Sequence, residues 1–149
     1  MAIFYLNALL VLAVDQFLKH LVHRFMYFGQ SIPLIDDVVR LTYVRNTGAA
    51  FSLFVGFSPY LAVVGVLVAI FVVYYHYRIP ANNYLMQLGL SCLLGGSIGN
   101  LTDRVVRTYV IDYLDITIWP VFNFADIMIN LGVFLILLNF LKSPDEEQG

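Results

Sequence analysis

The stretch GNLTDRVVRTYVIDYLDITIWPVFNFADIMIN, Gly99 to Asn130, places four aspartates in a chain that is otherwise very apolar. The 149 residues are 60% hydrophobic and only 12% charged, with a mean hydropathy of +0.81. Soluble domains are roughly half apolar and about a quarter charged. The composition therefore predicts an integral membrane protein, and the length predicts a single membrane domain over residues 1–149.

Four stretches of the chain are long and apolar enough to cross a bilayer, which takes about 20 residues in a helix. They lie at about 3–22, 59–77, 84–101 and 124–141. The first lacks the basic start and small-residue cleavage pattern of a signal peptide, so it is expected to remain in the mature protein. The polar tail at about 143–149 is expected to be disordered.

Two loops, at about 23–58 and 102–122, fall on the same side of these four spans. The first loop contains a β-branched and aromatic run, Val38–Val44, which predicts a strand, followed by a glycine turn at Asn46–Gly48. The second loop alternates similarly over Val105–Trp119. Open sheet edges cannot face lipid, so we expect a small β-sheet lying on one membrane face. The predicted fold class is a mainly α membrane protein with four transmembrane helices and this sheet.

The first span carries two ionisable residues, Asp15 and Lys19. Such residues are costly in a bilayer and are functional candidates by default. Their spacing of four places them on one helix face, where opposite charges can neutralise each other. Two interpretations remain open: an ion pair that ties the first helix to the bundle, or a role at a substrate site.

Two further polar groups occur where the third span ends and the fourth begins. Asn100, Asp103 and Arg104 are three and four residues apart, and share one face if the third helix continues that far. Asn123 and Asp126 occupy the start of the fourth span. Helix capping explains the asparagines but not Asp126 within FNFAD. The two groups are therefore expected to meet at the same side of the membrane.

Asp112 lies in the second loop, inside the apolar run YVIDYL, which suggests a site partly screened from water. Two screened carboxylates cannot both ionise easily and share one proton. This is the requirement of an aspartic protease, in which one carboxylate takes a proton from water and the other donates to the peptide carbonyl. A proton-coupled transporter with four helices also uses buried carboxylates, although its site is expected near the bilayer midplane.

Other chemistries have little support in the sequence. Cys92 is the only cysteine, which excludes a disulfide within the chain and a cysteine-rich metal site. The spacing of the histidines does not suggest a set of metal ligands. The histidines are His20, His23 and His76. The chain has no glycine-rich phosphate loop, and its net charge of −2 does not indicate a nucleic-acid partner.

Five motifs occur together in a defined order. They are DQFLK (Asp15–Lys19), VRNTGAAFS (Val44–Ser52), GGSIGNLTDR (Gly95–Arg104), YVIDYLD (Tyr109–Asp115) and FNFAD (Phe122–Asp126). With these motifs and four spans in place, the chain resembles the lipoprotein signal peptidases, or signal peptidases II, over almost its whole length.

The resemblance implies an aspartic endopeptidase of the bacterial inner membrane. Such an enzyme would remove the signal peptide from a prolipoprotein, cutting before a cysteine that carries diacylglycerol. The family's catalytic aspartates match Asp112 and Asp126. Its substrate-binding or supporting residues match Asp15, Lys19, Asn46, Gly48, Asn100, Asp103, Arg104 and Asn123. The resemblance implies no metal or cofactor, and the expected partners are membrane lipids and the diacylglyceryl prolipoprotein, handled by a monomer.

Charge distribution and resemblance disagree about sidedness. Six of the eight lysines and arginines lie on the two-loop side, so the positive-inside rule would place the loops in the cytoplasm. The resemblance instead implies cytoplasmic termini, loops on the outer face and an active site at the outer-leaflet interface. We follow the resemblance, because many of these cations lie within the site motifs.

Overall fold

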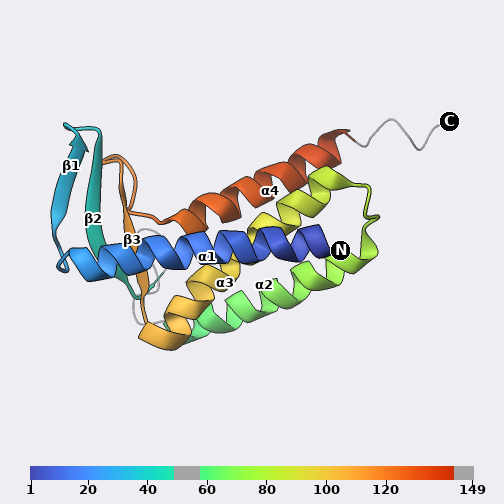
Figure 1. The fold of residues 1–149 in the computed structure, drawn as a ribbon, viewed down its shortest axis with the longest axis horizontal. Helices are drawn as coiled ribbons and strands as arrows, with labels where there is room; N and C mark the ends of the chain where they lie inside the picture. The colour runs from blue at the N-terminus through green and yellow to red at the C-terminus, as the bar shows by residue number, and fades with distance from the viewer. Residues whose placement is uncertain (49–57, 143–149) are drawn as a thin grey trace.

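The computed structural model describes residues 1–48 and 58–142. The helices are α1 (Ala2–Phe25), α2 (Ser58–Arg78), α3 (Tyr84–Arg107) and α4 (Phe124–Lys142), and the strands are β1 (Ser31–Ile35), β2 (Val39–Asn46) and β3 (Val110–Asp115). The four helices run along one axis, and the strands form a small sheet at the end of the bundle away from the N-terminus (Figure 1). The predicted disordered tail lies outside the described residues.

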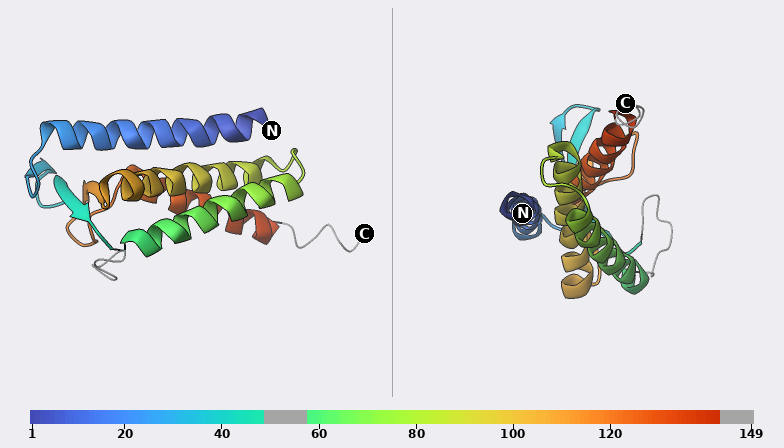
Figure 2. Two further views of the ribbon diagram at one scale, coloured as in Figure 1. Left: turned by 90° about the horizontal axis from the view of Figure 1, so that it is seen from below. Right: turned by 90° about the vertical axis from the view of Figure 1, so that its right-hand side faces the viewer.

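Each helix covers one of the stretches that hydropathy indicated as a span. In the described part of the chain, α1, α2 and α4 are long and apolar enough to cross a membrane. Helix α3 is the most polar of the four and lies at the centre, packed against the other three (Figure 2). The other helices therefore cover the polar groups of α3.

Helix α3 is longer than predicted. The apolar stretch predicts a span that ends near residue 101, but the helix continues to Arg107. An ion pair at i,i+4 spacing stabilises this extension, with Arg107 Nη1 2.6 Å from Asp103 Oδ1. Thr108, in the left-handed conformation with φ 68°, ends the helix. The end of an apolar run therefore does not mark the end of a helix, because polar residues can continue the helix beyond it.

Glycines on two sides of α3 let its neighbours approach closely. A Cβ atom on Gly95 would lie 2.6 Å from the carbonyl oxygen of Ala8 in α1, and one on Gly96 would lie 2.6 Å from that of Ala125 in α4. Backbone contacts at this distance leave no room for a side chain. The first turn of α4, which contains Asp126, is therefore held close against α3.

The sheet is antiparallel, in the order β1-β2-β3, and combines both loops as predicted. Val44 pairs with Asp112 and Asn46 pairs with Val110, so β2 delivers Asn46 to the neighbourhood of Asp112. Strand β2 corresponds to the predicted strand, whereas β1 was not predicted. In the second loop the strand is shorter than the alternating sequence indicated, because Val105–Arg107 belong to α3.

Two apolar clusters hold this arrangement. One fills the space between α1, α2 and α3. The other, formed by Val22, Tyr43, Ile111 and Tyr113, fixes β2 and β3 against the end of α1. Many large apolar side chains of α1, α2 and α4 remain exposed, as helices surrounded by lipid require.

Candidate active site

A cavity of about 770 Å³ opens where the sheet meets α3 and α4. Asp112 from β3 and Asp126 from the first turn of α4 both line it, and we call these two residues the dyad. The structure thus brings together the two aspartates that the sequence assigned to catalysis. Other candidate residues on its lining are Asn46, Gly48, Asn100 and Arg104.

Asp112 is only 2% exposed, and two amide groups hold its carboxylate. Asn46 Nδ2 donates to Oδ2 at 2.9 Å, and Asn123 Nδ2 donates to Oδ1 at 2.6 Å. Burial, together with the negative charge of Asp126, raises the pKa of Asp112 to about 7, although both amides oppose this shift. Near neutral pH this carboxyl group is therefore protonated in part of the molecules.

Asp126 is anchored at the start of α4. Its Oδ2 accepts from the backbone N–H of Asn123 at 3.1 Å, and Asn123 Oδ1 accepts from the N–H of Asp126 at 3.0 Å. These two bonds form a reciprocal helix cap. Asn100 Nδ2 donates to Asp126 Oδ1 at 2.8 Å. Both carboxylate oxygens of Asp126 are thereby fixed relative to α3 and α4.

Asn100 and Asn123 connect the two members of the dyad. Asn123 Nδ2 lies 3.2 Å from Asn100 Oδ1 as well as next to Asp112. Lys19 Nζ donates to the same Asn100 oxygen at 2.9 Å, which directs the Asn100 amide nitrogen toward Asp126. Because an ammonium can only donate, Lys19 sets the direction of this hydrogen-bond chain.

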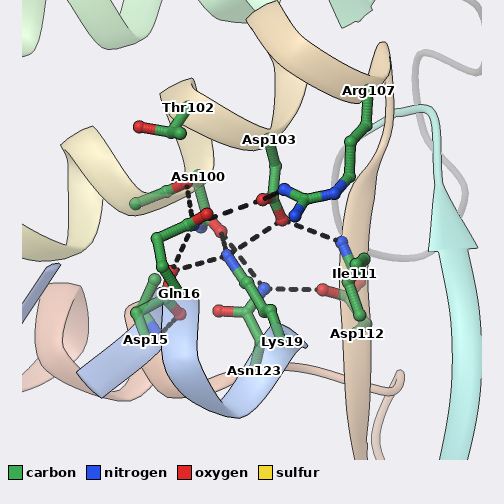
Figure 3. A network of polar contacts seen from close by, with 12 residues as sticks. Asp15, Gln16, Lys19, Asn100, Thr102, Asp103, Arg107, Ile111, Asp112 and Asn123 are labelled. Atoms are coloured by element: carbon green, nitrogen blue, oxygen red, sulfur yellow. Dashed lines mark hydrogen bonds and ion pairs between the residues drawn. The ribbon is translucent and has the colours of Figure 1, made fainter. Parts of the chain in front are cut away.

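A buried ionic network lies next to Asn100 and includes Lys19 (Figure 3). Lys19 Nζ is 2.8 Å from Asp15 Oδ2 and 3.1 Å from Asp103 Oδ2, and all three side chains are fully buried. None of the three lines the cavity. This placement favours the first interpretation of Asp15 and Lys19, an ion pair that ties the first helix to the bundle.

Arg104 lies at the cavity beside the turn that follows β2. Its Nη2 donates to the carbonyl oxygen of Gly48 at 3.4 Å, and Asn46 Oδ1 accepts from the N–H of Gly48 at 2.9 Å. The positive charge of Arg104 interacts with the dyad carboxylates. The turn is thus attached both to α3 and to the residue that holds Asp112.

Two residues of the network were missed by the sequence analysis. Gln16 Nε2 lies 3.2 Å from Asp15 Oδ2, 3.1 Å from the carbonyl oxygen of Gly99 and 3.2 Å from Asp103 Oδ1. Arg107 pairs with Asp103. A polar Gln16 within an apolar span, and the i,i+4 spacing of Asp103 and Arg107, were the available signals.

The site offers acid–base chemistry. Two carboxylates in one cavity, one of them with a raised pKa, can activate water and protonate a carbonyl oxygen. Within residues 1–48 and 58–142, no group of three or more histidine, cysteine, aspartate or glutamate side chains is placed to hold a metal ion.

Known proteins are similar to this chain in sequence and in fold. The family model described as Signal peptidase (SPase) II matches residues 7–142. A lipoprotein signal peptidase of Moorella thermoacetica is 43% identical over 146 residues, covering 98% of this chain and 97% of that protein. One from Bacillus subtilis is 40% identical over 150 residues, covering 98% and 97%. A bacterial membrane enzyme solved by the in meso method at 2.3 Å resolution is 31% identical, with a TM-score of 0.92 and coverage of 100% and 94%.

Fold and site together define an aspartic peptidase of the membrane. The chain belongs to the signal peptidase II family. This membership supports the peptidase interpretation of the buried carboxylates and gives no support to the transporter.

Proposed function

We propose that this protein removes the signal peptide from diacylglyceryl-modified prolipoproteins, cutting before the lipidated cysteine, with Asp112 and Asp126 as its catalytic residues. The observation that carries the proposal is that both carboxylates enter one cavity at the end of a membrane bundle, each held by amide donors. The names of the relatives support the choice of substrate.

The chemistry follows from the raised pKa of Asp112. As a water oxygen attacks the scissile carbonyl carbon, Asp126 takes a proton from the water and protonated Asp112 donates its proton to the carbonyl oxygen. The tetrahedral diol then collapses, the C–N bond breaks, and Asp126 passes its proton to the leaving nitrogen. Asp112 recovers a proton from one hydroxyl group of the diol, whose oxygen stays on carbon and becomes the carbonyl oxygen of the new carboxyl group. The products are a new carboxylate on the signal peptide and a free amino group on the lipidated cysteine.

A second cavity supports a lipid-bearing substrate. It has a volume of about 280 Å³ and lies between α2, α3 and α4. Apolar side chains of α2 and α4 contribute to its lining, including Leu61, Val64 and Ile129. It shares Asn100 and Arg104 with the catalytic cavity. An acyl chain in this second cavity would therefore lie next to the scissile bond.

The proposed orientation has the termini in the cytoplasm and the sheet on the outer face of the bacterial cytoplasmic membrane. A diacylglyceryl group in the outer leaflet then reaches the dyad without crossing the bilayer. Among the cations that oppose this orientation, Lys19 and Arg107 are ion-paired and Arg104 lines the cavity. Because these cations have roles within the site, their number does not indicate on which side of the membrane the loops lie. The proposed enzyme acts as a monomer, because one chain supplies the whole site.

The test uses purified protein in detergent with a lipidated prolipoprotein and its unlipidated form. Mass spectrometry should detect a signal peptide released immediately before the lipidated cysteine, and no release from the unlipidated form. Asp112→Asn and Asp126→Asn should each abolish release. Asp37→Asn, at an exposed turn between β1 and β2, is the matched control and should remain active.

Two results would contradict the proposal. Near-normal turnover by Asp112→Asn would exclude it from the dyad. Collapse of a pH gradient across reconstituted vesicles on addition of a small cation, without peptide release, would instead indicate a transporter.

A further inference from the structure

Two buried carboxylates outside the dyad hold the backbone next to it. Asp15 Oδ1 accepts the N–H of Ala125 at 3.0 Å, and Asp103 Oδ2 accepts the N–H of Ile111 at 3.1 Å. Ala125 and Ile111 each immediately precede a member of the dyad. The same type of contact therefore fixes both chain segments that carry the catalytic carboxylates.

Lys19 joins these two anchors. Its ammonium lies between them, 2.8 Å from Asp15 Oδ2 and 3.1 Å from Asp103 Oδ2 (Figure 3). Asp15 also lies against Gly99, where any side chain would collide with its carboxylate. The link from Ala125 through Asp15, Lys19 and Asp103 to Ile111 is thus continuous and fully enclosed.

The network ties α1 to α3, but holding helices together does not by itself require buried charges. Burying ions carries a desolvation penalty, and well-packed apolar residues often stabilise a fold equally well or better. Charged groups do provide strongly directional contacts of defined length. The network ends at Ala125 and Ile111, the residues that precede the dyad. This position indicates that the directional contacts serve to place the two catalytic carboxylates.

Resting on the function proposed above, we propose that Asp15, Lys19 and Asp103 form a positioning triad that sets the separation of the two catalytic carboxylates. None of the triad lines the cavity, so it acts through the backbone and not on the substrate. Lys19 additionally orients Asn100, which donates to Asp126.

The separation has a chemical consequence that can be measured. The charge of Asp126 contributes to the raised pKa of Asp112, so a wider dyad should lower that pKa. Activity that requires protonated Asp112 would then be lost at a lower pH. Among the described residues, the other charged or titratable groups around the dyad are Asp15 and Lys19 from α1, Asp103 and Arg104 from α3, and Tyr113 from β3. Arg107 acts on this group through Asp103.

Asp15→Asn is the first test. The amide has the size of the carboxylate, retains one oxygen for the N–H of Ala125, and leaves Lys19 paired with Asp103. Its nitrogen would face the ammonium of Lys19, donor against donor, which should open the link. We expect kcat on a lipidated peptide to fall about 10- to 100-fold, because misplacing reacting groups by about 1 Å costs on the order of 100-fold. KM should change little.

Lys19→Arg tests the pH dependence. A neutral residue would alter the field at Asp112 directly, since Lys19 opposes its raised pKa, whereas arginine keeps the charge and changes the geometry. The basic limb of the pH–rate profile should move to lower pH, by on the order of one unit. The same assay on the wild type provides the reference limb.

Leu90→Ala is the control for a merely structural effect, because Leu90 is buried in the cluster between α1, α2 and α3. It should lower Tm without shifting the pH–rate limb. Wild-type kcat in Asp15→Asn, or an unshifted limb in Lys19→Arg, would overturn the triad while leaving the proposed function intact. No cleavage of lipidated prolipoprotein by the wild type would instead overturn the proposed function.

Discussion

Replacing Asp112 by asparagine is expected to change how the stability of the protein depends on pH. The ordinary pKa of an aspartate is 3.8, and burial with the nearby Asp126 raises that of Asp112 to about 7 in the folded protein. Below about pH 4 the carboxyl is protonated in both folded and unfolded states. Between about pH 4 and about pH 7 the unfolded chain ionises while the folded protein keeps the proton, so stability falls as the pH rises.

The size of this effect follows from the shift. A difference of about 3 pKa units corresponds to about 4 kcal/mol of unfolding free energy, lost by the wild type across that window. Asparagine removes this loss because it does not ionise. It also replaces one of the two acceptor oxygens that Asn46 and Asn123 use, at a cost of about 1–3 kcal/mol. The variant should therefore be less stable than the wild type at about pH 4, and more stable at about pH 8 by roughly 1–3 kcal/mol.

The assay is thermal unfolding in detergent at several pH values, followed by intrinsic fluorescence. Other titrating groups are common to both proteins, so the difference in Tm reports the titration of Asp112 together with its coupling to Asp126. The curves of Tm against pH for the wild type and Asp112→Asn should cross. Asp37→Asn should follow the wild type, because Asp37 is exposed and its left-handed conformation, with φ 58°, suits asparagine. A Tm difference that is the same at about pH 4 and about pH 8 would refute a carboxyl kept protonated by burial.

Three further outcomes are expected. Asn46→Ala should lower kcat/KM on a lipidated peptide about 5- to 100-fold in steady-state kinetics, because it leaves a buried carboxylate oxygen without its donor; unchanged efficiency would show that the β2 turn merely connects elements. In a cysteine-free background, Asp36→Cys should react with an impermeant thiol reagent added outside cells and Ala81→Cys should not, and the reverse pattern would overturn the proposed orientation. Gly96→Ala should lower Tm by the equivalent of about 1–3 kcal/mol, since its Cβ would lie 2.6 Å from the Ala125 carbonyl oxygen, and an unchanged Tm would mean that α4 can move away freely.

The sequence predicts much of the fold because hydropathy and helical spacing are local properties. The spans α1, α2 and α4 follow from apolar length, whereas α3 is too polar to qualify by that measure. The pairing of Asp15 with Lys19 follows from a spacing of four. Where helix and apolar run diverge, prediction fails: α3 continues to Arg107 although polarity rises after residue 101. Strand β1 is mostly exposed and contains a proline, so its sequence does not show the pattern of a strand. Its strand conformation depends on pairing with β2.

The site was only partly predictable, because its contacts depend on how distant segments meet. The sequence and its family resemblance named both members of the dyad. They could not show that Asp103 shares Lys19 with Asp15, since that contact needs the close approach of α1 and α3. The role of Asn46 as a substrate-binding or supporting residue, which the resemblance implies, stays a prediction. The hydrogen bond from Asn46 to Asp112 depends on the register of β2 and β3.

The central position of α3 also has a consequence for how the protein enters the membrane. Charged residues oppose helix insertion, and the end of α3 carries Asp103, Arg104 and Arg107. Only residues 79–83 separate α3 from the strongly apolar α2. We expect these two helices to insert together as a hairpin, with α2 supplying the apolar driving force. Helices α1 and α4 then pack against α3. The insertion of this polar helix therefore depends on its apolar neighbours.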